Sequence, residues 1–392
     1  MKNLDTYKIL KKKVLFRADL NVPVSNGKIT DFSRINSIIP SLRKLIISKN
    51  KVFILAHLGR PRGKLNKKYS LKFLCTQLKI SMRIPKIYFL ESFDDKLIKD
   101  TISKMQYGEI CLFENTRFNI GEESNDLNFA KKLSSNFDIF VNDAFSASHR
   151  NHSSIVGLPN FLPAVAGLSF INEIKNLNNF LTKSKKPNIA IIGGSKISTK
   201  IKVIYNLLEI FDTIVIAGAM ANTFLLANNL KIGKSLAEID FIDISIDIIE
   251  KAKLCNCEIV LPLDAVCSTD LKNKDNIRMC KINDVSDDHM ILDIGKKTKD
   301  LICEKIIKSR SLLWNGPLGA FEHKPFDKCS IDVANTISKH SKDLQIEAMA
   351  GGGDTIALIN LAEAQNGFKY LSNAGGAFLE WLEGNKSPGA IA

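Results

Sequence analysis

The chain has 392 residues, of which 45% are hydrophobic and 24% are charged. This composition is ordinary for a globular protein and supplies enough apolar surface for two domain-sized cores, so it excludes the disordered and fibrous classes. The 55 lysines and arginines outnumber the 41 aspartates and glutamates, which gives a formal net charge of +14.

The positive excess lies in the first half of the chain. Residues 1–170 hold 28 Lys and Arg against 14 Asp and Glu, whereas residues 171–392 hold 27 of each. A basic half can serve nucleic acid, a membrane surface or a small multiply anionic ligand. The sequence has no RNP-type aromatic motif, no zinc-finger spacing and no apolar stretch of membrane-spanning length, so we expect neither a nucleic-acid nor a membrane partner.

The cysteines and the N-terminus bear on the cellular compartment. Eight cysteines are scattered along the chain without a CxxC pair, a pattern typical of buried thiols in a reducing compartment. The first residues lack the apolar core of a signal peptide. We therefore expect a cytoplasmic protein.

Short apolar runs alternate with amphipathic, helix-compatible segments along the chain. This rhythm predicts parallel β/α units whose strands are buried on both faces. The runs lie at residues 14–16, 52–56, 110–113, 139–141, 189–192, 213–217, 259–261, 311–314 and 346–350. The change in charge coincides with a helix-like segment at 171–181, which predicts a domain junction there. The expected fold is α/β, with two Rossmann-like parallel-sheet domains joined by a helical hinge.

Polar and basic side chains follow the predicted strands of the first half. They are Arg17, Asp19 and Asn21, then His57 and Arg60, then Glu114, Asn115 and Arg117, and finally Asn142, Asp143, His149 and Arg150. Parallel strands end at one edge of a sheet, and ligands bind outside that edge. Several cations gathered there would repel one another unless an anion neutralised them, and guanidinium groups pair well with phosphate and carboxylate. The first half therefore predicts a site for a small anion.

Glycine clusters follow the strands of the second half. Such clusters let backbone N–H groups approach a phosphate at the N-terminus of a helix. The sharpest is GGGDT at 351–355, where Asp354 suits Mg²⁺ and the Thr355 hydroxyl suits a phosphate oxygen, although a plain turn explains this motif alone equally well. Lys196 and Lys200 place two cations on one face of a following helix.

Three other motifs are incomplete. Gly233, Lys234 and Ser235 resemble the end of a P-loop, but Asn228 stands where its first glycine is required. Ile356 likewise interrupts a G-x-G-x-x-G pattern, and the pair His149 and His152 has no third metal ligand. An anion site in one half and a nucleotide site in the other is the arrangement of a phosphoryl transferase.

Nine segments in order resemble the phosphoglycerate kinase family over essentially the whole chain. They are RADLNVP at 17–23, DFSRI at 31–35, HLGRPRG at 57–63, ENTRF at 114–118, NDAFSASHRNHSS at 142–154, GGSKISTKI at 193–201, WNGPLGAFE at 314–322, GGGDT at 351–355 and SNAGGAFLEWLEG at 372–384. The resemblance implies reversible phosphoryl transfer between 1,3-bisphosphoglycerate with ADP and 3-phosphoglycerate with ATP, a step of glycolysis and gluconeogenesis.

The resemblance also implies roles for individual residues. The triose would be bound by Asp19, Asn21, Arg34, His57, Arg60, Arg117 and Arg150. The nucleotide would be bound by Lys196, Lys200, Gly218, Asn315, Glu322, Gly351, Gly352, Gly353, Asp354 and Thr355, with Glu322 on the ribose and Asp354 on Mg²⁺. Catalytic roles would fall to Arg34, Lys196, Lys200, Gly353 and Gly376. An acyl phosphate has a carboxylate leaving group that needs no proton, so no general base is expected.

The implied organisation is a triose domain at 1–170, a linking helix at 171–184 and a nucleotide domain at 185–370, with 375–392 packing back on the first domain. We expect a monomer that closes at its hinge. Departures from the family pattern at Ala217, Ala219, Ile291, Lys296 and Ala374 are expected to alter nucleotide contacts. A different small-molecule kinase and a basic nucleic-acid-binding protein are the competing interpretations at this point.

Overall fold

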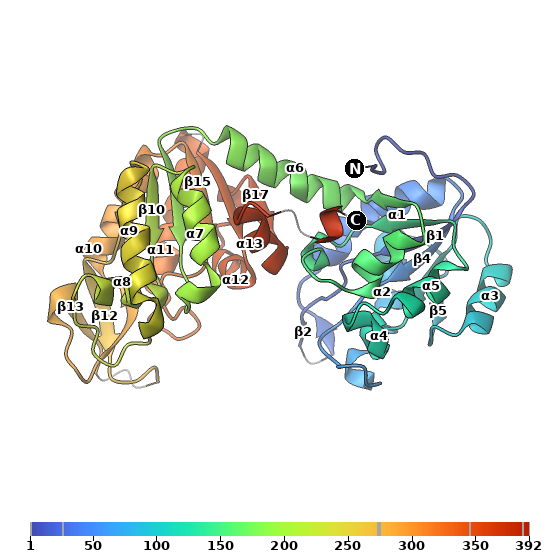
Figure 1. Cartoon of the computed structure of the whole chain (residues 1–392), viewed down its shortest axis with the longest axis horizontal. Coiled ribbons are helices and arrows are strands. Elements are labelled where there is room, and N and C mark those ends of the chain that lie inside the picture. Colours follow the sequence, from blue (N-terminus) through green and yellow to red (C-terminus); the bar gives the residue numbers. More distant parts are fainter. Residues whose placement is uncertain (1, 26, 273–275, 345, 386–387, 392) are drawn as a thin grey trace. The chain divides into compact units, whose positions relative to one another are not determined.

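The computed structural model describes residues 2–25, 27–272, 276–344, 346–385 and 388–391. The chain forms two compact units, the first made of Met1–Lys175 with Lys386–Ala392 and the second of Asn176–Asn385 (Figure 1). The division falls within helix α6 (Leu168–Lys183). Each unit has its own parallel sheet and its own core, as the alternation of apolar runs and amphipathic segments predicts.

The first unit is built on a six-stranded parallel sheet with the order β5-β6-β4-β1-β7-β8. Its strands are β1 (Lys13–Arg17), β4 (Lys51–Leu55), β5 (Tyr88–Leu90), β6 (Ile110–Phe113), β7 (Ile139–Asn142) and β8 (Ala164–Ala166). A two-stranded hairpin of β2 (Val24–Ser25) and β3 (Lys28–Ile29) follows β1. The central strands β1, β4 and β6 are almost wholly buried because helices cover both faces of the sheet.

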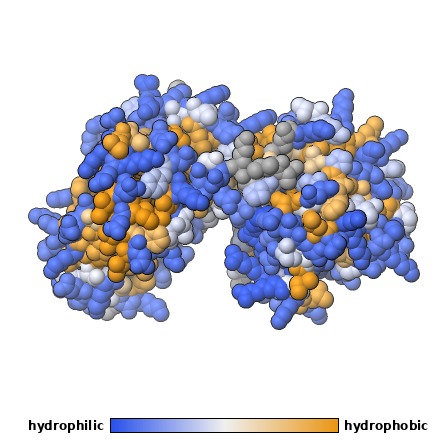
Figure 2. All heavy atoms as spheres, viewed as in Figure 1, coloured by the Kyte–Doolittle hydropathy of each residue, from blue (hydrophilic) through white to orange (hydrophobic). Residues whose placement is uncertain are grey.

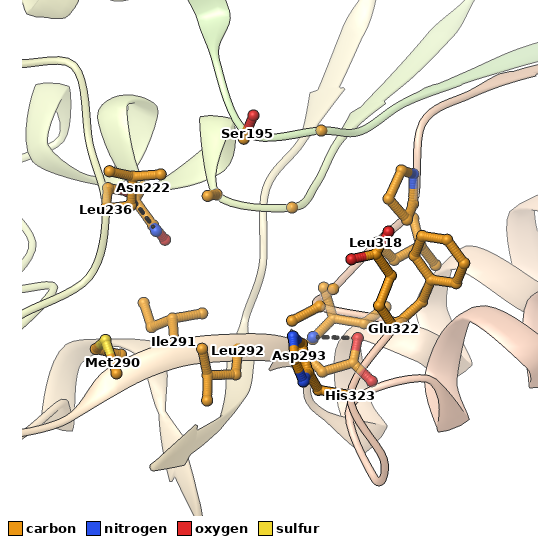
Figure 3. A pocket seen from close by; sticks show the side chains of 18 of the residues that line it. Ser195, Asn222, Leu236, Met290, Ile291, Leu292, Asp293, Leu318, Glu322 and His323 are labelled. Carbon is orange, nitrogen blue, oxygen red and sulfur yellow. Dashed lines mark hydrogen bonds between the residues drawn. The ribbon is translucent and has the colours of Figure 1, made fainter. Parts of the chain in front are cut away.

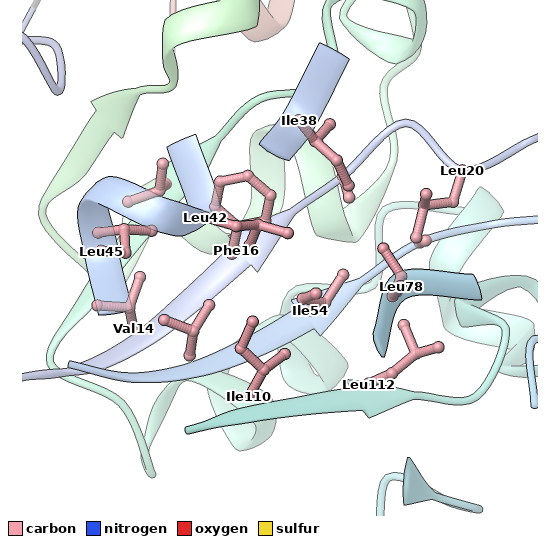
Figure 4. Close-up of a cluster of buried hydrophobic side chains, with 14 of the residues drawn as sticks. Val14, Phe16, Leu20, Ile38, Leu42, Leu45, Ile54, Leu78, Ile110 and Leu112 are labelled. Atoms are coloured by element: carbon pink, nitrogen blue, oxygen red, sulfur yellow. The ribbon is translucent and has the colours of Figure 1, made fainter. Parts of the chain in front are cut away.

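Alternate residues of these strands enter two separate cores. Val14 and Phe16 of β1 pack with Ile38 and Leu42 of α1 (Ser33–Ile47) and with α2 (Leu74–Met82), as Figure 4 shows. Leu15, between them, points to the opposite core, which includes α3 (Asp95–Lys104) and α5 (Leu127–Ser134). Because successive side chains of a strand point to opposite faces, the three central residues of β1 are all apolar.

The second unit repeats this design with the strand order β11-β10-β9-β15-β16-β17. Its parallel strands are β9 (Asn188–Ile192), β10 (Thr213–Ile216), β11 (Glu258–Val260), β15 (Ser311–Asn315), β16 (Glu347–Gly351) and β17 (Tyr370–Ser372). Trp314 is fully buried in the core that the sheet shares with α10 (Lys296–Lys308), α11 (Lys328–Leu344) and α12 (Gly353–Leu361). The other helices are α7 (Ile201–Leu208), α8 (Met220–Ala227), α9 (Ile242–Leu254) and α13 (Gly376–Leu382).

The second unit also contains a small antiparallel sheet that the apolar runs do not predict. It has the order β13-β12-β14, with β12 (Asp264–Ser268), β13 (Arg278–Lys281) and β14 (Met290–Ile294). Figure 2 shows that the visible surface is mostly hydrophilic, with apolar patches on both units. Leu236 and Ile239 are exposed apolar residues of the second unit, and Leu236 belongs to the site described below.

All nine predicted apolar runs form strands within a residue or two of the expected bounds, so the α/β fold class with two parallel sheets is confirmed. The expected return of 375–392 to the first unit needs correction in its bounds. Helix α13 packs on α7 within the second unit, and only the final helix α14 (Pro388–Ile391) belongs to the first. Within the described residues, no helix is both long and apolar enough to cross a membrane.

Candidate active site

The carboxyl edge of the first sheet gathers the polar residues that follow β1, β4, β6 and β7. Asp19, after β1, accepts hydrogen bonds from the guanidinium of Arg34 and from the hydroxyl of Ser146. Arg34 lies in the first turn of α1, and its Nη1 is 2.5 Å from Asp19 Oδ2. The structure therefore brings together a cation and a carboxylate that lie 15 positions apart in the sequence.

Arg117 and Asn21 meet the loop that follows β4. The Nη1 of Arg117 donates to the carbonyl of Gly59 at 2.6 Å, while the Gly59 N–H donates to Asn21 Oδ1 at 2.9 Å. Arg117 is almost fully buried, and its Nε is 3.2 Å from Glu123. Burial lowers the pKa of Arg117, and nearby Arg60 adds to this effect. The loop and the guanidinium thus fix each other's position.

Arg60 and Arg150 are held less tightly. Arg60 is exposed, and within the described part of the chain its guanidinium has no hydrogen-bond or ion-pair partner. Arg150 is half-buried and donates from Nε to the neighbouring His149 at 3.3 Å. These two arginines keep most of their donors available for a ligand.

His57 follows β4 and contacts a fully buried arginine. Its Nδ1 is 3.0 Å from Nη2 of Arg17, the last residue of β1. Burial lowers the pKa of His57 well below its usual value, and the charges of Arg17, Arg117, Arg34 and His152 act in the same direction. The ring is therefore neutral at physiological pH.

The carboxyl edge of the second sheet forms a glycine-lined cavity of about 270 Å³. Gly218 has φ +69°, and a Cβ at this position would lie 2.6 Å from the carbonyl oxygen of Gly194. Gly352 has φ +102°, and a Cβ there would lie 2.8 Å from Asn315 Nδ2. Both positions favour glycine because their φ is positive and because a Cβ would collide with the backbone of Gly194 in one case and with the side chain of Asn315 in the other.

Lys200 is buried under this cavity and bonded to three oxygens. Its Nζ donates to the carbonyls of Gly193 and Asn315 and, at 2.6 Å, to Asn315 Oδ1. Burial lowers the pKa of Lys200 to about 8, although Asp354 opposes this change. Lys196, by contrast, is exposed at the rim of the cavity.

The GGGDT segment forms the end of β16 and the start of α12. Gly351 ends the strand, Gly352 precedes the helix, and Gly353 is its first residue. Thr355 is buried and accepts a hydrogen bond from the N–H of Gly316 at 2.7 Å, whereas Asp354 is exposed in the first helical turn. Gly352, Gly353, Asp354 and Thr355 line the cavity, so it lies at the N-terminus of α12, where the first N–H groups of a helix have no partner within the helix.

A larger cavity of about 360 Å³ adjoins the glycine-lined one, since Gly194, Ser195, Pro317 and Asp354 line both. Figure 3 shows Met290, Ile291 and Leu292 of β14 on one side, facing Asn222 and Leu236 on the other. Such an apolar slot beside an anion site suits a flat aromatic base.

Two acidic side chains besides Asp354 line this larger cavity. Glu322 is exposed at its edge, whereas Asp293 is buried and accepts the N–H groups of Ile294 and Cys329. Burial raises the pKa of Asp293 to about 7. Glu322 thus presents an exposed carboxylate at the edge of this cavity.

The sequence departures are not equivalent in the structure. Ala219 and Ile291 line the larger cavity, so their side chains can shape it. Ala217 is fully buried in the core, and neither it nor Lys296, the first residue of α10, lines the cavity. Ala374 is buried beneath the start of α13.

Sequence reasoning missed several residues of both cavities. It did not find Met290 and Leu292, because β14 belongs to the small sheet that it did not predict, and it did not find Leu236, which lies in the loop after α8. Gly376 begins α13 but does not line the glycine-lined cavity, which its neighbour Gly375 does. Among the described residues, no group of three His, Cys, Asp or Glu side chains is placed to hold a metal ion.

A cationic sheet edge in one α/β unit, and a glycine-lined cavity with an adjoining apolar slot in the other, define a two-domain kinase that transfers phosphoryl groups between small molecules. The family model of phosphoglycerate kinase matches residues 4–385. The chain belongs to the phosphoglycerate kinase family. It transfers a phosphoryl group reversibly between 1,3-bisphosphoglycerate with ADP and 3-phosphoglycerate with ATP.

Individual relatives agree with the family model. The chain is 43% identical to a phosphoglycerate kinase of Xanthobacter autotrophicus over 391 residues, covering 100% of this chain and 98% of the relative. It is 42% identical to one of Brucella abortus, covering 99% and 98% of the two chains. The structure of phosphoglycerate kinase from Coxiella burnetii superimposes with a TM-score of 0.87 at 35% identity, covering 99% and 97%. The enzyme from Pyrococcus horikoshii gives a TM-score of 0.84 at 28% identity, covering 100% and 98%.

Proposed function

We propose that the first unit binds the triose and the second binds the nucleotide. The triose would lie at the cationic sheet edge on the residues predicted for it: Asp19, Asn21, Arg34, His57, Arg60, Arg117 and Arg150. The observation that carries this proposal is the proximity of Arg17, Arg34 and Arg117 to one another, since all three lower the pKa of His57. Asp19 and Glu123 pair with Arg34 and Arg117 and balance part of this charge, and an anionic ligand would offset the repulsion that remains.

The nucleotide phosphates would lie in the glycine-lined cavity and the base in the apolar slot. Lys196, Lys200 and the N–H groups at the start of α12 supply positive charge and donors around the phosphates. Glu322 at the edge of the slot would accept hydrogen bonds from the ribose hydroxyls, and Gly218 lines the slot beside Gly194, which lines both cavities.

We propose Mg²⁺ as the metal that accompanies the nucleotide. Asp354 is exposed at the glycine-lined cavity. Within the described residues, it does not belong to any group of three His, Cys, Asp or Glu side chains that could hold a metal ion. One carboxylate fits Mg²⁺ that is held mainly by nucleotide phosphates and water. When bound, Mg²⁺ would neutralise charge on the phosphate oxygens.

The transfer itself would depend on positioning and charge neutralisation. The carboxylate oxygen of 3-phosphoglycerate is already anionic, so no base has to remove a proton before it attacks the terminal phosphoryl group. Arg34 from the triose side and Lys200 from the nucleotide side would stabilise the negative charge in the transition state. Gly353 would donate its backbone N–H, and Gly376 would contribute at the start of α13.

We further propose that the protein is a cytoplasmic monomer in which the two units close around their ligands at a hinge near α6. The two proposed ligand sites lie on different units, and the reaction requires their ligands to meet. The residues proposed for each of the two ligand sites all come from one chain, which supports a monomer. Sedimentation velocity at assay concentration tests this, because a dimer would contradict it.

A coupled assay with 3-phosphoglycerate and MgATP tests the function directly. We expect phosphorylation of 3-phosphoglycerate, and replacement of Arg117 by alanine should raise the KM for that substrate. Turnover with another acceptor, but none with 3-phosphoglycerate, would contradict the proposed triose site.

A further inference from the structure

Arg17 is completely buried, and its guanidinium nitrogens contact three different partners. Its Nε donates to Ser154 Oγ at 2.9 Å, its Nη1 donates to the carbonyl of Ala18 at 2.5 Å, and its Nη2 lies 3.0 Å from Nδ1 of His57. Ser154 is itself held by Glu122, which accepts from the Ser154 N–H at 3.0 Å and from its hydroxyl at 2.6 Å. The position of the fork is therefore fixed from β1, from residues 153–157 and from the segment after β4.

The chemistry of the two side chains determines which atom carries the proton between Arg17 and His57. A guanidinium has five N–H donors, has no acceptor and stays protonated in proteins. The hydrogen on the line from Nη2 to Nδ1 therefore belongs to Arg17, and Nδ1 of His57 must present its lone pair. A neutral imidazole has only one N–H, so that N–H is at Nε2.

The surroundings of His57 exclude the alternative of a doubly protonated ring. An imidazolium would point the Nδ1 N–H at an N–H of Arg17. His57 is 4% exposed, and the charges of Arg17, Arg117 and Arg34 all oppose a further positive charge on its ring. Nε2 itself makes no hydrogen bond to any residue that the structure describes.

We propose that Arg17 is a positioning residue that fixes His57 as its neutral Nε2–H tautomer, so that Nε2 donates to an anionic oxygen of the triose. This inference rests on the proposed binding of 3-phosphoglycerate at the first sheet edge. The other tautomer would direct a lone pair at a carboxylate or phosphate oxygen and repel it. Arg17 thus acts on the substrate through His57 and does not need to touch it.

The tautomer can be measured in the unmodified enzyme. Long-range ¹H–¹⁵N correlation spectra of histidine-labelled protein distinguish a protonated from an unprotonated ring nitrogen, and the His57→Gln variant identifies the His57 signals. From pH 6 to pH 8 we expect a protonated Nε2 and an unprotonated Nδ1 without titration. A protonated Nδ1, in either the other tautomer or the imidazolium, would overturn the inference.

The Arg17→Met variant tests whether Arg17 is the cause. We expect His57 to populate both tautomers or to titrate near its ordinary pKa, and the KM for 3-phosphoglycerate to rise by about tenfold or more, with the KM for ATP unchanged. Ser154→Ala is the matched control, because it removes another partner of Arg17 but leaves the contact with His57. If Arg17→Met does not fold, the double variant Arg17→Met/Glu122→Gln removes both buried charges together.

Two outcomes separate this inference from the proposed function. If the Nε2–H tautomer persists unchanged when Arg17 is replaced, the positioning role of Arg17 is wrong. If the wild-type His57 is the Nε2–H tautomer but its Nε2 signal does not move on addition of 3-phosphoglycerate, the tautomer assignment holds and the assignment of His57 to the triose is contradicted.

Discussion

At the scale of single residues, the two cations proposed to act on the transferring group are held in different ways. Arg34 is paired with Asp19, so part of its charge is balanced before a ligand arrives. Lys200 is bonded only to neutral oxygens of Gly193 and Asn315. A phosphate entering the cavity would therefore offer Lys200 its first close negative partner.

Replacement of either cation by alanine should reduce turnover much more than stability. We expect Arg34→Ala and Lys200→Ala each to lose about 3 to 5 kcal/mol of transition-state stabilisation, as removal of arginine fingers and oxyanion-hole donors does. Steady-state kinetics and thermal melts measure the two effects. The exposed neighbours Arg43 on α1 and Lys202 on α7 provide matched alanine controls, which should stay near wild type. A fall in melting temperature that accounts for the loss of activity would refute the catalytic roles.

The lowered pKa of Lys200 predicts proton uptake when nucleotide binds. With a pKa of about 8, Lys200 is about half protonated at pH 8 in the free enzyme, and nearby phosphates raise its pKa because they favour the charged form. Binding of ADP at pH 8 should therefore take up as much as about half a proton, and less at pH 6.5, where Lys200 is already charged. Calorimetry in buffers of different ionisation enthalpy measures this uptake. A binding enthalpy independent of buffer, or an unchanged uptake in Lys200→Met, would contradict it.

At the scale of elements, the shape of the glycine-lined cavity depends on the turn between β16 and α12. Gly352 combines φ +102° with a close approach to Asn315, whereas Gly353 has no such backbone conformation and has open space around the position of a Cβ. Two adjacent glycines in one motif therefore have different physical reasons to be glycine.

This difference predicts different effects of alanine at the two positions. Gly352→Ala should strain the turn, at a conformational cost of about 1 to 3 kcal/mol for a residue forced to a positive φ. The variant should therefore have a lower melting temperature and bind nucleotide more weakly. Gly353→Ala should keep the melting temperature, so any loss of nucleotide affinity in that variant reports close approach of a phosphate. Melting curves and ADP titrations of both variants check this. Equal melting temperatures for the two would contradict the strain argument.

The sequence predicts most elements of the sheets but fewer walls of the nucleotide cavity. The buried strands are short apolar runs, and the residues after them lie at one edge by topology, so Asp19, His57 and Arg117 could be placed together in advance. The strands β13 and β14 carry no such signal, because β13 is largely exposed and β14 only partly buried. The network of Arg17, Glu122 and Ser154 depends on tertiary contacts between distant segments, which local patterns do not contain.

At the scale of the whole molecule, the charge asymmetry of the chain coincides with the division into two units. The basic half forms the unit with the cationic sheet edge, and the electrically balanced half forms the unit with the glycine-lined cavity. Only a few of the excess charges belong to the site, since lysines such as Lys67, Lys68 and Lys132 are exposed elsewhere. Net charge therefore points to the unit that we propose to bind the triose but overstates the size of the proposed site.

Binding on different units predicts a change of shape only when both ligands are present. We expect small-angle scattering to give a smaller radius of gyration with 3-phosphoglycerate and MgADP together than with either ligand alone. These two ligands cannot react with each other, so the complex is stable during the measurement. A radius of gyration that is the same without ligands, with either ligand alone and with both would argue against hinge closure.

The central claim, that triose and nucleotide bind to separate units, is tested most directly by isothermal titration of two variants with two ligands. Arg117→Ala should raise the Kd for 3-phosphoglycerate by about tenfold or more, as expected for loss of a charge-assisted contact, and should leave the Kd for ADP unchanged. Gly352→Ala should raise the Kd for ADP and leave the Kd for 3-phosphoglycerate unchanged. The reverse pattern, or loss of both ligands in either folded variant, would contradict the assignment of the two sites.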